Sequence, residues 1–438
     1  MSLGACGGHP LNGSDAAPNA GAGGGIGGHG PAMNGGAGVD AGADRNATTP
    51  SAMLPSGICI TNAFRHDGGA CTCQPDTPAV CPTTCANLEL DDDNCGACGN
   101  KCPDTATCND GKCGQEPTVL RPASLSTSPL VCGGIDLALA GSILYAADAA
   151  NGSVFMMPAT GGPPVVLVKG ELRPKGIVVR GQTMFWMAGE PIKDPQQPTP
   201  AALSIHAAPV GGGPVHTIFL TADGVGGFTV SPDGQSVFVS SGAKLWKVPA
   251  AGGAGVVVGV EAHNGIPRAL ALDGTNLVFP NDINGDIDVI QLVDGTPASC
   301  GNVDPVTGGL LDTLCARVSR GQGSLLFDTI LARDGWVSWA DGNNLTRNPL
   351  TPGSLQFNEN VVSLDNSIAA MTFGASAIYF AIYDPGFETG GEIGKTPLAS
   401  NTTAVLLARH QNGPRSIAAD DARVYWSTKD CAIFSLPN

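Results

Sequence analysis

The chain has 438 residues and a formal net charge of −16, from 22 lysines and arginines against 38 aspartates and glutamates. Nucleic-acid binding needs clustered basic side chains that displace counterions, so this balance argues against a nucleic-acid partner and against anionic membrane surfaces. The sequence has no run of about 18 apolar residues, so we expect no helix that crosses a bilayer.

Residues 1–57 begin with a lipobox-like motif and continue as a linker. Leu3-Gly4-Ala5-Cys6 matches a bacterial lipobox, so we predict lipidation of Cys6. That interpretation needs an export segment upstream of Met1; the alternative is an unpaired thiol in a disordered tail. The Gly- and Ala-rich residues that follow contain no aromatic side chain, and they cannot bury enough apolar surface to offset their ordering entropy. We therefore expect a disordered tether.

Residues 58–114 predict a small disulfide-rich module. An even number of cysteines in a short segment poor in hydrophobic residues indicates a disulfide framework that takes the place of a core. The alternative is zinc, because Cys95 and Cys98 form a C-x-x-C pair, but the only nearby histidine is His66. The pairing cannot be read from the spacing. The ten cysteines, of fifteen in the chain, are Cys59, Cys71, Cys73, Cys81, Cys85, Cys95, Cys98, Cys102, Cys108 and Cys113.

The second half of this module is similar to a known type of domain. It resembles the small Asn-Cys-Gly-x-Cys-Gly modules that recur in exported proteins of myxobacteria, and the resemblance implies export rather than an activity. The matching residues are Asn94, Cys95, Gly96, Cys98, Gly99, Cys102, Cys108, Gly111 and Cys113.

Residues 115–438 carry a sevenfold repeat. Each unit has an apolar run, a turn, a second apolar run that usually ends near an aromatic residue, a polar loop and a third strand. Equivalent second-strand positions recur at intervals of 40 to 60 residues. Four short strands per unit with a period near forty predict an all-β fold, a seven-bladed β-propeller. The equivalent positions are Ala146, Trp186, Val239, Phe279, Trp339, Phe380 and Trp426.

Proline marks the end of the third strand in six units, where a missing N–H is tolerated beside a turn. These residues are Pro158, Pro209, Pro249, Pro349, Pro397 and Pro437. The seventh unit lacks a fourth strand, which would leave an open sheet edge. We expect residues 118–125 to supply this strand and thus to close the ring with an N-terminal segment.

The repeat resembles the YWTD/NHL/streptogramin-lyase-like superfamily of β-propellers, in the segments Val424–Thr428 and Val337–Asp341. The resemblance rests on scaffold residues and implies the fold. The superfamily includes sensors, binding proteins and some enzymes.

Four further cysteines predict two disulfides. Cys132 precedes the first inner strand and Cys431 lies in a turn of the last unit, and both positions belong to the same face of a propeller. We expect them to form a bond that locks the ring. Cys300 and Cys315 flank an insertion in the fourth unit and are expected to pair.

One segment could bind calcium. Asp282, Asn284, Asp286 and Asp288 place oxygen atoms at alternate positions, as a hard cation requires. The glycine and the bidentate glutamate of an EF-hand are missing, so a solvated turn is the favoured alternative. No other cofactor is expected.

Two entry loops share a histidine five residues before an arginine: His263 with Arg268, and His410 with Arg415. The second unit has Arg173 and Lys175 in the comparable place. These six residues are candidates for ligand binding near the central channel. A histidine base beside arginines would also suit a lyase or hydrolase. A purely structural role for a repeated Pro-Arg pair is favoured over both.

These features predict an exported, lipid-anchored protein of the cell surface or outer membrane, and an enzyme is the less favoured interpretation. The expected partner is a protein, peptide or glycan bound at the loop-bearing face. The alternatives are a lyase or lactone hydrolase with a metal-assisted site in the channel, and a structural subunit of a surface layer or fibre.

Overall fold

The computed structural model describes most of the chain beyond residue 62, in separate ranges of residues. They are 63–65, 71–73, 77–123, 134–189, 202–261, 267–280, 286–292, 298–300, 315–319, 329–350, 358–364, 366–383, 391–399 and 402–438. The lipobox with Cys6, the tether, Cys59, Cys132, His263, Asp282 and Asn284 lie outside these ranges, so their predictions stay untested. None of the described residues forms a helix long and apolar enough to cross a membrane.

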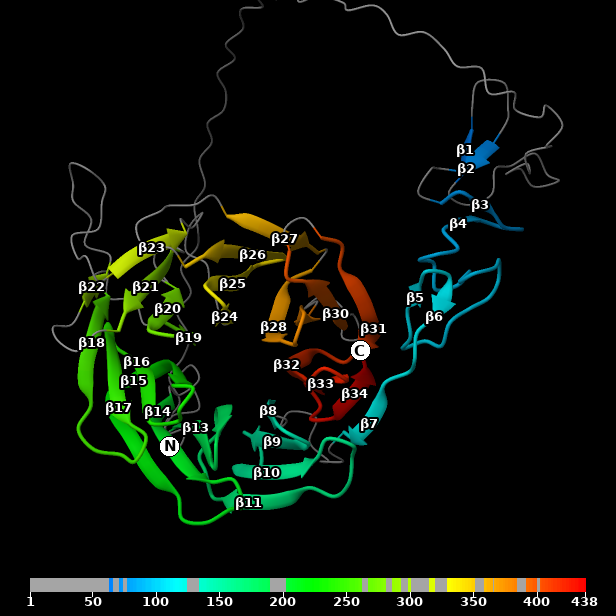
Figure 1. The fold of residues 1–438 in the computed structure, drawn as a ribbon. Helices are drawn as coiled ribbons and strands as arrows, with labels where there is room; N and C mark the ends of the chain where they lie inside the picture. Colours follow the sequence, from blue (N-terminus) through cyan, green and yellow to red (C-terminus); the bar gives the residue numbers. More distant parts are fainter. Residues whose placement is uncertain are drawn as a thin grey trace, which may run out of the picture. The chain divides into compact units, whose positions relative to one another are not determined.

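The described residues from 118 onward form a ring of β-sheets that radiate from a channel, which is the arrangement of a β-propeller (Figure 1). The strand pairs are antiparallel except for β18 with β22, which is parallel. Five sheets have four strands each. The first has β8 (Ile135–Ala140), β9 (Ile143–Asp148), β10 (Ser153–Pro158) and β11 (Val165–Lys169). The next has β19 (Ala271–Asp273), β20 (Asn276–Pro280), β21 (Ile287–Gln291) and β23 (Cys315–Ser319).

The remaining four-stranded sheets follow in chain order. One contains β24 (Ile330–Arg333), β25 (Trp336–Asp341), β26 (Asn344–Pro349) and β27 (Glu359–Ser363). Another contains β28 (Ile368–Phe373), β29 (Ala377–Ile382), β30 (Gly391–Pro397) and β31 (Val405–Gln411). The last contains β32 (Pro414–Ala419), β33 (Arg423–Thr428), β34 (Ile433–Pro437) and β7 (Thr118–Arg121).

An eight-stranded sheet completes the ring. It contains β12 (Lys175–Arg180), β13 (Thr183–Gly189), β14 (Ala202–Pro209), β15 (His216–Val230), β16 (Ser236–Ser241), β17 (Lys244–Pro249), β18 (Val256–Glu261) and β22 (Ala298–Cys300). The sequence predicts two separate sheets here, and hence seven in all. The structure instead joins them, because β15 runs for 15 residues without a break and pairs with both β14 and β16. The predicted count of seven separate blades is therefore not confirmed.

The closing strand is confirmed. β7 pairs antiparallel with β34, so the segment before the first unit supplies the fourth strand of the last sheet. Arg121 of this strand donates to the backbone carbonyl of Cys431 at 2.8 Å and reaches the Asp148 carboxyl, at the end of β9, at 3.4 Å. The Ser427 hydroxyl donates to the carbonyl of Ile135 at 2.6 Å. The last sheet and the first are thus joined by hydrogen bonds as well as by apolar packing.

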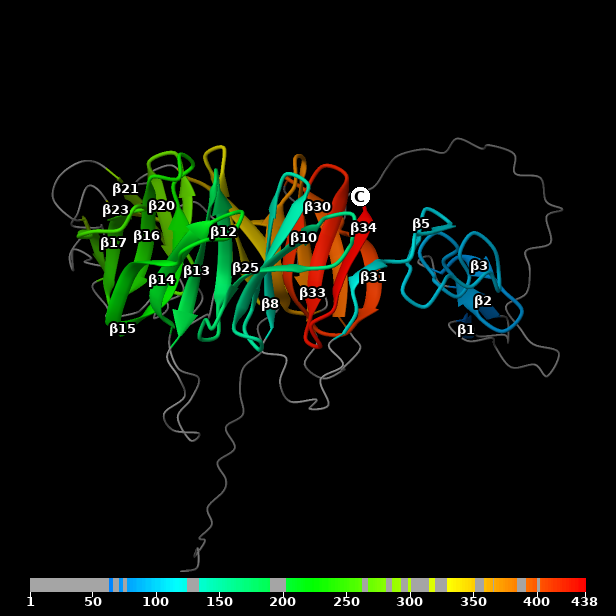
Figure 2. The same cartoon turned by 90° about the horizontal axis from the view of Figure 1, so that it is seen from below.

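All six predicted proline positions are the last residues of third strands, as expected from their missing N–H. The aromatic positions of the second strands pack between neighbouring sheets, and Trp186 and Trp426 have no exposed surface. Figure 2 shows the sheets of the ring from the side.

The described part of the cysteine-rich segment contains three pairs of short antiparallel strands: β1 (Ala63–Arg65) with β2 (Cys71–Cys73), β3 (Ala79–Val80) with β4 (Cys85–Ala86), and β5 (Cys108–Asn109) with β6 (Lys112–Cys113). The prediction of disulfides is confirmed for eight cysteines. The bonds are Cys73–Cys85, Cys81–Cys98, Cys95–Cys108 and Cys102–Cys113.

Other cysteine predictions remain open. Cys431 is disulfide-bonded, but its predicted partner Cys132 lies outside the described residues. Cys71 lies in β2, Cys300 ends β22 and Cys315 begins β23; their side chains are outside the described part.

Candidate functional site

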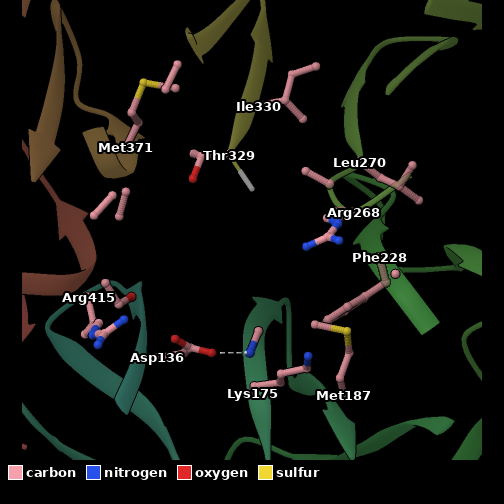
Figure 3. Close-up of a pocket in the computed structure, with 18 of the residues that line it drawn as sticks. Asp136, Lys175, Met187, Phe228, Arg268, Leu270, Thr329, Ile330, Met371 and Arg415 are labelled. Carbon is pink, nitrogen blue, oxygen red and sulfur yellow. Dashed lines mark hydrogen bonds between the residues drawn. The ribbon is translucent and has the colours of Figure 1, made fainter. Parts of the chain in front are cut away.

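The central channel widens into a cavity of about 1310 Å³. The first strand of each repeat unit runs in the same direction along the channel, so the residues that begin these strands meet at one end of it. We call this end the channel mouth and define it by Asp136, Lys175, Asp223, Arg268, Thr329, Ser367 and Arg415, all of which line the cavity. Figure 3 shows the charged side chains of Asp136, Lys175, Arg268 and Arg415 around this space.

Three basic side chains are exposed at the channel mouth: Lys175, Arg268 and Arg415. The Arg415 guanidinium lies 5.3 Å from the centre of the Tyr383 ring, in the geometry of a cation–π contact. Such a contact orients the guanidinium without neutralising it. In a chain with a net charge of −16, this cluster places three basic side chains around one cavity.

Asp136 is a carboxyl that sequence reasoning missed. It accepts a hydrogen bond of 2.6 Å from the backbone N–H of Gly176, in the next sheet. Burial raises the pKa of Asp136, while this hydrogen bond and the charge of Lys175 act in the opposite direction. A carboxyl of this kind can accept or donate a proton closer to neutrality than an exposed aspartate can.

The structure sorts the six predicted ligand residues into three groups. Lys175, Arg268 and Arg415 line the cavity, so their position at the channel agrees with the sequence analysis, and their role in ligand binding stays a prediction. Arg173 and His410 are exposed and have positive φ angles of 48° and 56°, and neither belongs to the cavity lining. His263 lies outside the described residues.

The predicted calcium segment is only half described. Asp286 and Asp288 are 4% and 0% exposed, and Asp288 lies within strand β21. The favoured alternative of a solvated turn is therefore wrong for these two residues, because Asp288 is buried within β21 and Asp286 is buried directly before it. A calcium site that includes Asp282 and Asn284 stays untested.

Among the described residues, one group of three potential metal ligands comes together: Cys95, Cys102 and Cys113. Each of these sulfurs belongs to a disulfide, so none is a thiolate that could bind zinc. The zinc interpretation of the C-x-x-C pair is not supported by these contacts.

Comparisons with known proteins show the fold. No family model and no curated protein matches the sequence. Among solved structures, virginiamycin B lyase from Staphylococcus aureus has a TM-score of 0.54 at 13% identity over 74% of this chain and 100% of the lyase. A streptogramin B lyase has the same TM-score at 14% identity, over 74% and 97% of the two chains.

A catalytically inactive histidine-to-alanine variant of the Staphylococcus aureus lyase, solved with quinupristin, also matches, with a TM-score of 0.53 at 12% identity over 74% of this chain and 100% of the lyase. These likenesses show that this part of the chain has a β-propeller fold.

Proposed function

We propose that this protein is an exported, lipid-anchored, seven-bladed β-propeller that binds a protein, peptide or glycan through an acidic group at the channel mouth. The observation that carries the binding site is the convergence of Lys175, Arg268 and Arg415 on one cavity in a strongly acidic chain. Guanidinium and ammonium groups bind carboxylates and other anions through charge-assisted hydrogen bonds.

Packing supports seven blades despite the continuous strand β15. The described residues of the ring form seven apolar clusters, each shared by two successive units. One of them joins the last unit to the first. One of these clusters lies between the two halves of the eight-stranded sheet, where Phe185 and Ile205 pack with Phe228 and Val239. The two halves pack against each other as neighbouring blades do.

Export is supported by the disulfides, which persist in oxidising compartments. The anchor rests on the lipobox-like position of Cys6, followed by a linker that would hold the propeller away from the membrane. Metabolic labelling with a fatty-acid analogue, compared between the wild type and Cys6→Ser, tests the anchor. Equal labelling of both proteins would reject it.

The binding proposal is tested by calorimetric titration with a hexaglutamate peptide and trigalacturonate as acidic probes, and hexaglutamine as a neutral control. Removing one charge-assisted hydrogen bond should weaken binding by about tenfold or more. Arg268→Ala and Arg415→Ala should therefore both bind the acidic probes less tightly than the wild type does. Binding should also weaken as salt rises, because salt screens exposed charges. Equal affinity of all variants, with circular dichroism showing an intact fold, would reject the site.

A second function is favoured by one observation, the Asp136 carboxyl with its raised pKa beside Lys175 in the cavity. A carboxyl of this kind could act as a general base in a lyase or lactone hydrolase, with a divalent metal as an assisting group. Incubation with quinupristin, with and without magnesium or calcium, tests this possibility by mass spectrometry. Opening of the quinupristin ring by the wild type but not by Asp136→Asn would support a lyase or hydrolase activity. If no product forms with or without the metal, that activity is rejected for this substrate.

A further inference from the structure

A chain of hydrogen bonds crosses the boundary between the first sheet and the eight-stranded sheet, apart from the residues that line the channel. Glu171, which follows β11, accepts from the Trp186 indole N–H at 2.9 Å. The same carboxylate oxygen lies 2.7 Å from Nδ1 of His206. The other ring nitrogen, Nε2, lies 3.1 Å from Oγ of Ser204. Serine, imidazole and carboxylate are therefore connected in series.

The positions of the protons in this chain of hydrogen bonds follow from the Glu171 carboxylate at its end. Burial alone would raise the pKa of Glu171, but the hydrogen bonds from His206 and Trp186 together bring it below its ordinary value. A carboxylate can only accept, so Nδ1 of His206 carries the hydrogen. In the neutral ring, Nε2 then has a lone pair directed at the Ser204 hydroxyl.

The scaffold does not require this arrangement. Trp426 occupies the position of Trp186 in the last sheet, and its indole N–H donates to the amide oxygen of Gln411 at 3.0 Å. The strand partner of Trp426 is Phe434, where that of Trp186 is His206. A neutral amide is therefore sufficient to satisfy the buried indole. The carboxylate, histidine and serine are additional to that structural role.

The three groups are shielded but solvent reaches them. Ser204 is 6% exposed, and the side chains of His206 and Glu171 are 20% and 9% exposed. Ser204 and His206 are two residues apart on β14, so both side chains lie on the same face of the strand. Strand geometry holds the two groups at a fixed separation.

We propose that Ser204 is an activated nucleophile, with His206 as its general base and Glu171 as the carboxylate that orients the imidazole, and that it accepts acyl groups from small esters. The order of atoms, from Oγ to Nε2 and from Nδ1 to a carboxylate, is that of serine hydrolases. Ser204 Oγ attacks the ester carbonyl carbon while Nε2 takes the hydroxyl proton. The bond to the alcohol oxygen then breaks, the alcohol leaves with that proton, and water hydrolyses the acyl-serine to a carboxylic acid and free serine.

The test uses para-nitrophenyl acetate, with free thiols blocked beforehand, and peptide mapping to locate the acetyl group. We expect acetylation of Ser204, and a loss of the reaction in Ser204→Ala. Glu171→Gln is the decisive variant, because Gln411 shows that an amide still satisfies the indole. It should keep the thermal stability while acetylation falls by about a hundredfold or more.

Ser338→Ala, which removes a buried serine of another sheet, serves as a matched control and should react like the wild type. The proposal does not involve the residues that line the channel. Acetylation at the background rate in the folded wild type would overturn it. So would an equal rate in Glu171→Gln, since a merely structural network predicts no change there.

Discussion

Asp136 and Gly176 join two neighbouring sheets at the channel mouth, where the aspartate carboxyl accepts the glycine N–H at 2.6 Å. The bond links the first strands of two successive repeat units, beside the basic side chain of Lys175. Both residues line the cavity. The Asp136 carboxyl therefore both joins two sheets and lines the proposed ligand site.

The substitution Asp136→Asn should stabilise the protein at neutral pH. Burial raises the folded-state pKa, so the folded protein binds this proton more tightly than the unfolded chain does. The stability contributed by the protonated form is present at low pH and is lost as pH rises through the folded-state pKa. Asparagine keeps an acceptor for the Gly176 N–H and has no charge to bury. The melting temperatures of the two proteins should coincide near pH 4 (about the ordinary aspartate value) and diverge as pH rises; a constant difference would contradict this explanation.

The substitution Arg121→Ala should weaken the closure of the ring. Arg121 is the side chain that joins the closing strand to both Cys431 and Asp148. A hydrogen bond to a charged group contributes about 1.5–3 kcal/mol, so we expect a loss of that size in the free energy of unfolding. Arg121→Lys should lose less, because it keeps the charge. Chemical denaturation measures both variants, and an unchanged midpoint for Arg121→Ala would show that the contact does not support closure.

The substitution Gly227→Ala should disturb the channel mouth. A Cβ atom at this position would lie 2.6 Å from the backbone oxygen of Arg268, closer than any real contact allows. The segment that carries Arg268, just before β19, would have to move. We therefore expect about 1–3 kcal/mol of destabilisation together with weaker binding of acidic probes. Gly211→Ala is the matched control, because its added Cβ meets nothing within 4 Å. Similar behaviour of both variants would reject the steric argument.

The cysteine-rich segment should respond to reductant and not to chelator. Its buried cluster consists of Cys95, Cys102 and Cys108, so its fold depends on the disulfides. Removing a native disulfide from a small domain costs about 2–5 kcal/mol. Limited proteolysis should cleave residues 77–113 after reduction and leave them intact after treatment with EDTA. Release of zinc with cleavage after EDTA alone would establish the metal interpretation instead.

The repeat predicts the strands well because strand ends have strict local requirements. Pro158, Pro249 and Pro437 end their strands because proline has no N–H to donate. The separation of sheets is harder to predict. Residues 222–227 contain Ala-Asp-Gly-Val-Gly-Gly, a typical turn composition, yet they stay within β15 because the strands on both sides pair with it.

The channel mouth is predictable where the position within the repeat determines the site. Lys175, Arg268 and Arg415 stand at or near the starts of inner strands, which the repeat locates. Asp136 also lies near such a start, but nothing in its local sequence distinguishes it from a surface aspartate. The spacing of Ser204 and His206, two residues apart, indicates that their side chains lie on the same face of a strand. The contact between His206 and Glu171 depends on how two neighbouring sheets pack, and this packing cannot be read from a sequence pattern.

The most direct test of the binding site reverses its charge. The triple variant Lys175→Glu, Arg268→Glu and Arg415→Glu should lose affinity for hexaglutamate and gain affinity for hexalysine, measured by calorimetry at low salt with the fold checked by circular dichroism. If the folded triple variant binds hexaglutamate as tightly as the wild type does, the acidic ligand is not bound at the channel mouth and the central claim is wrong.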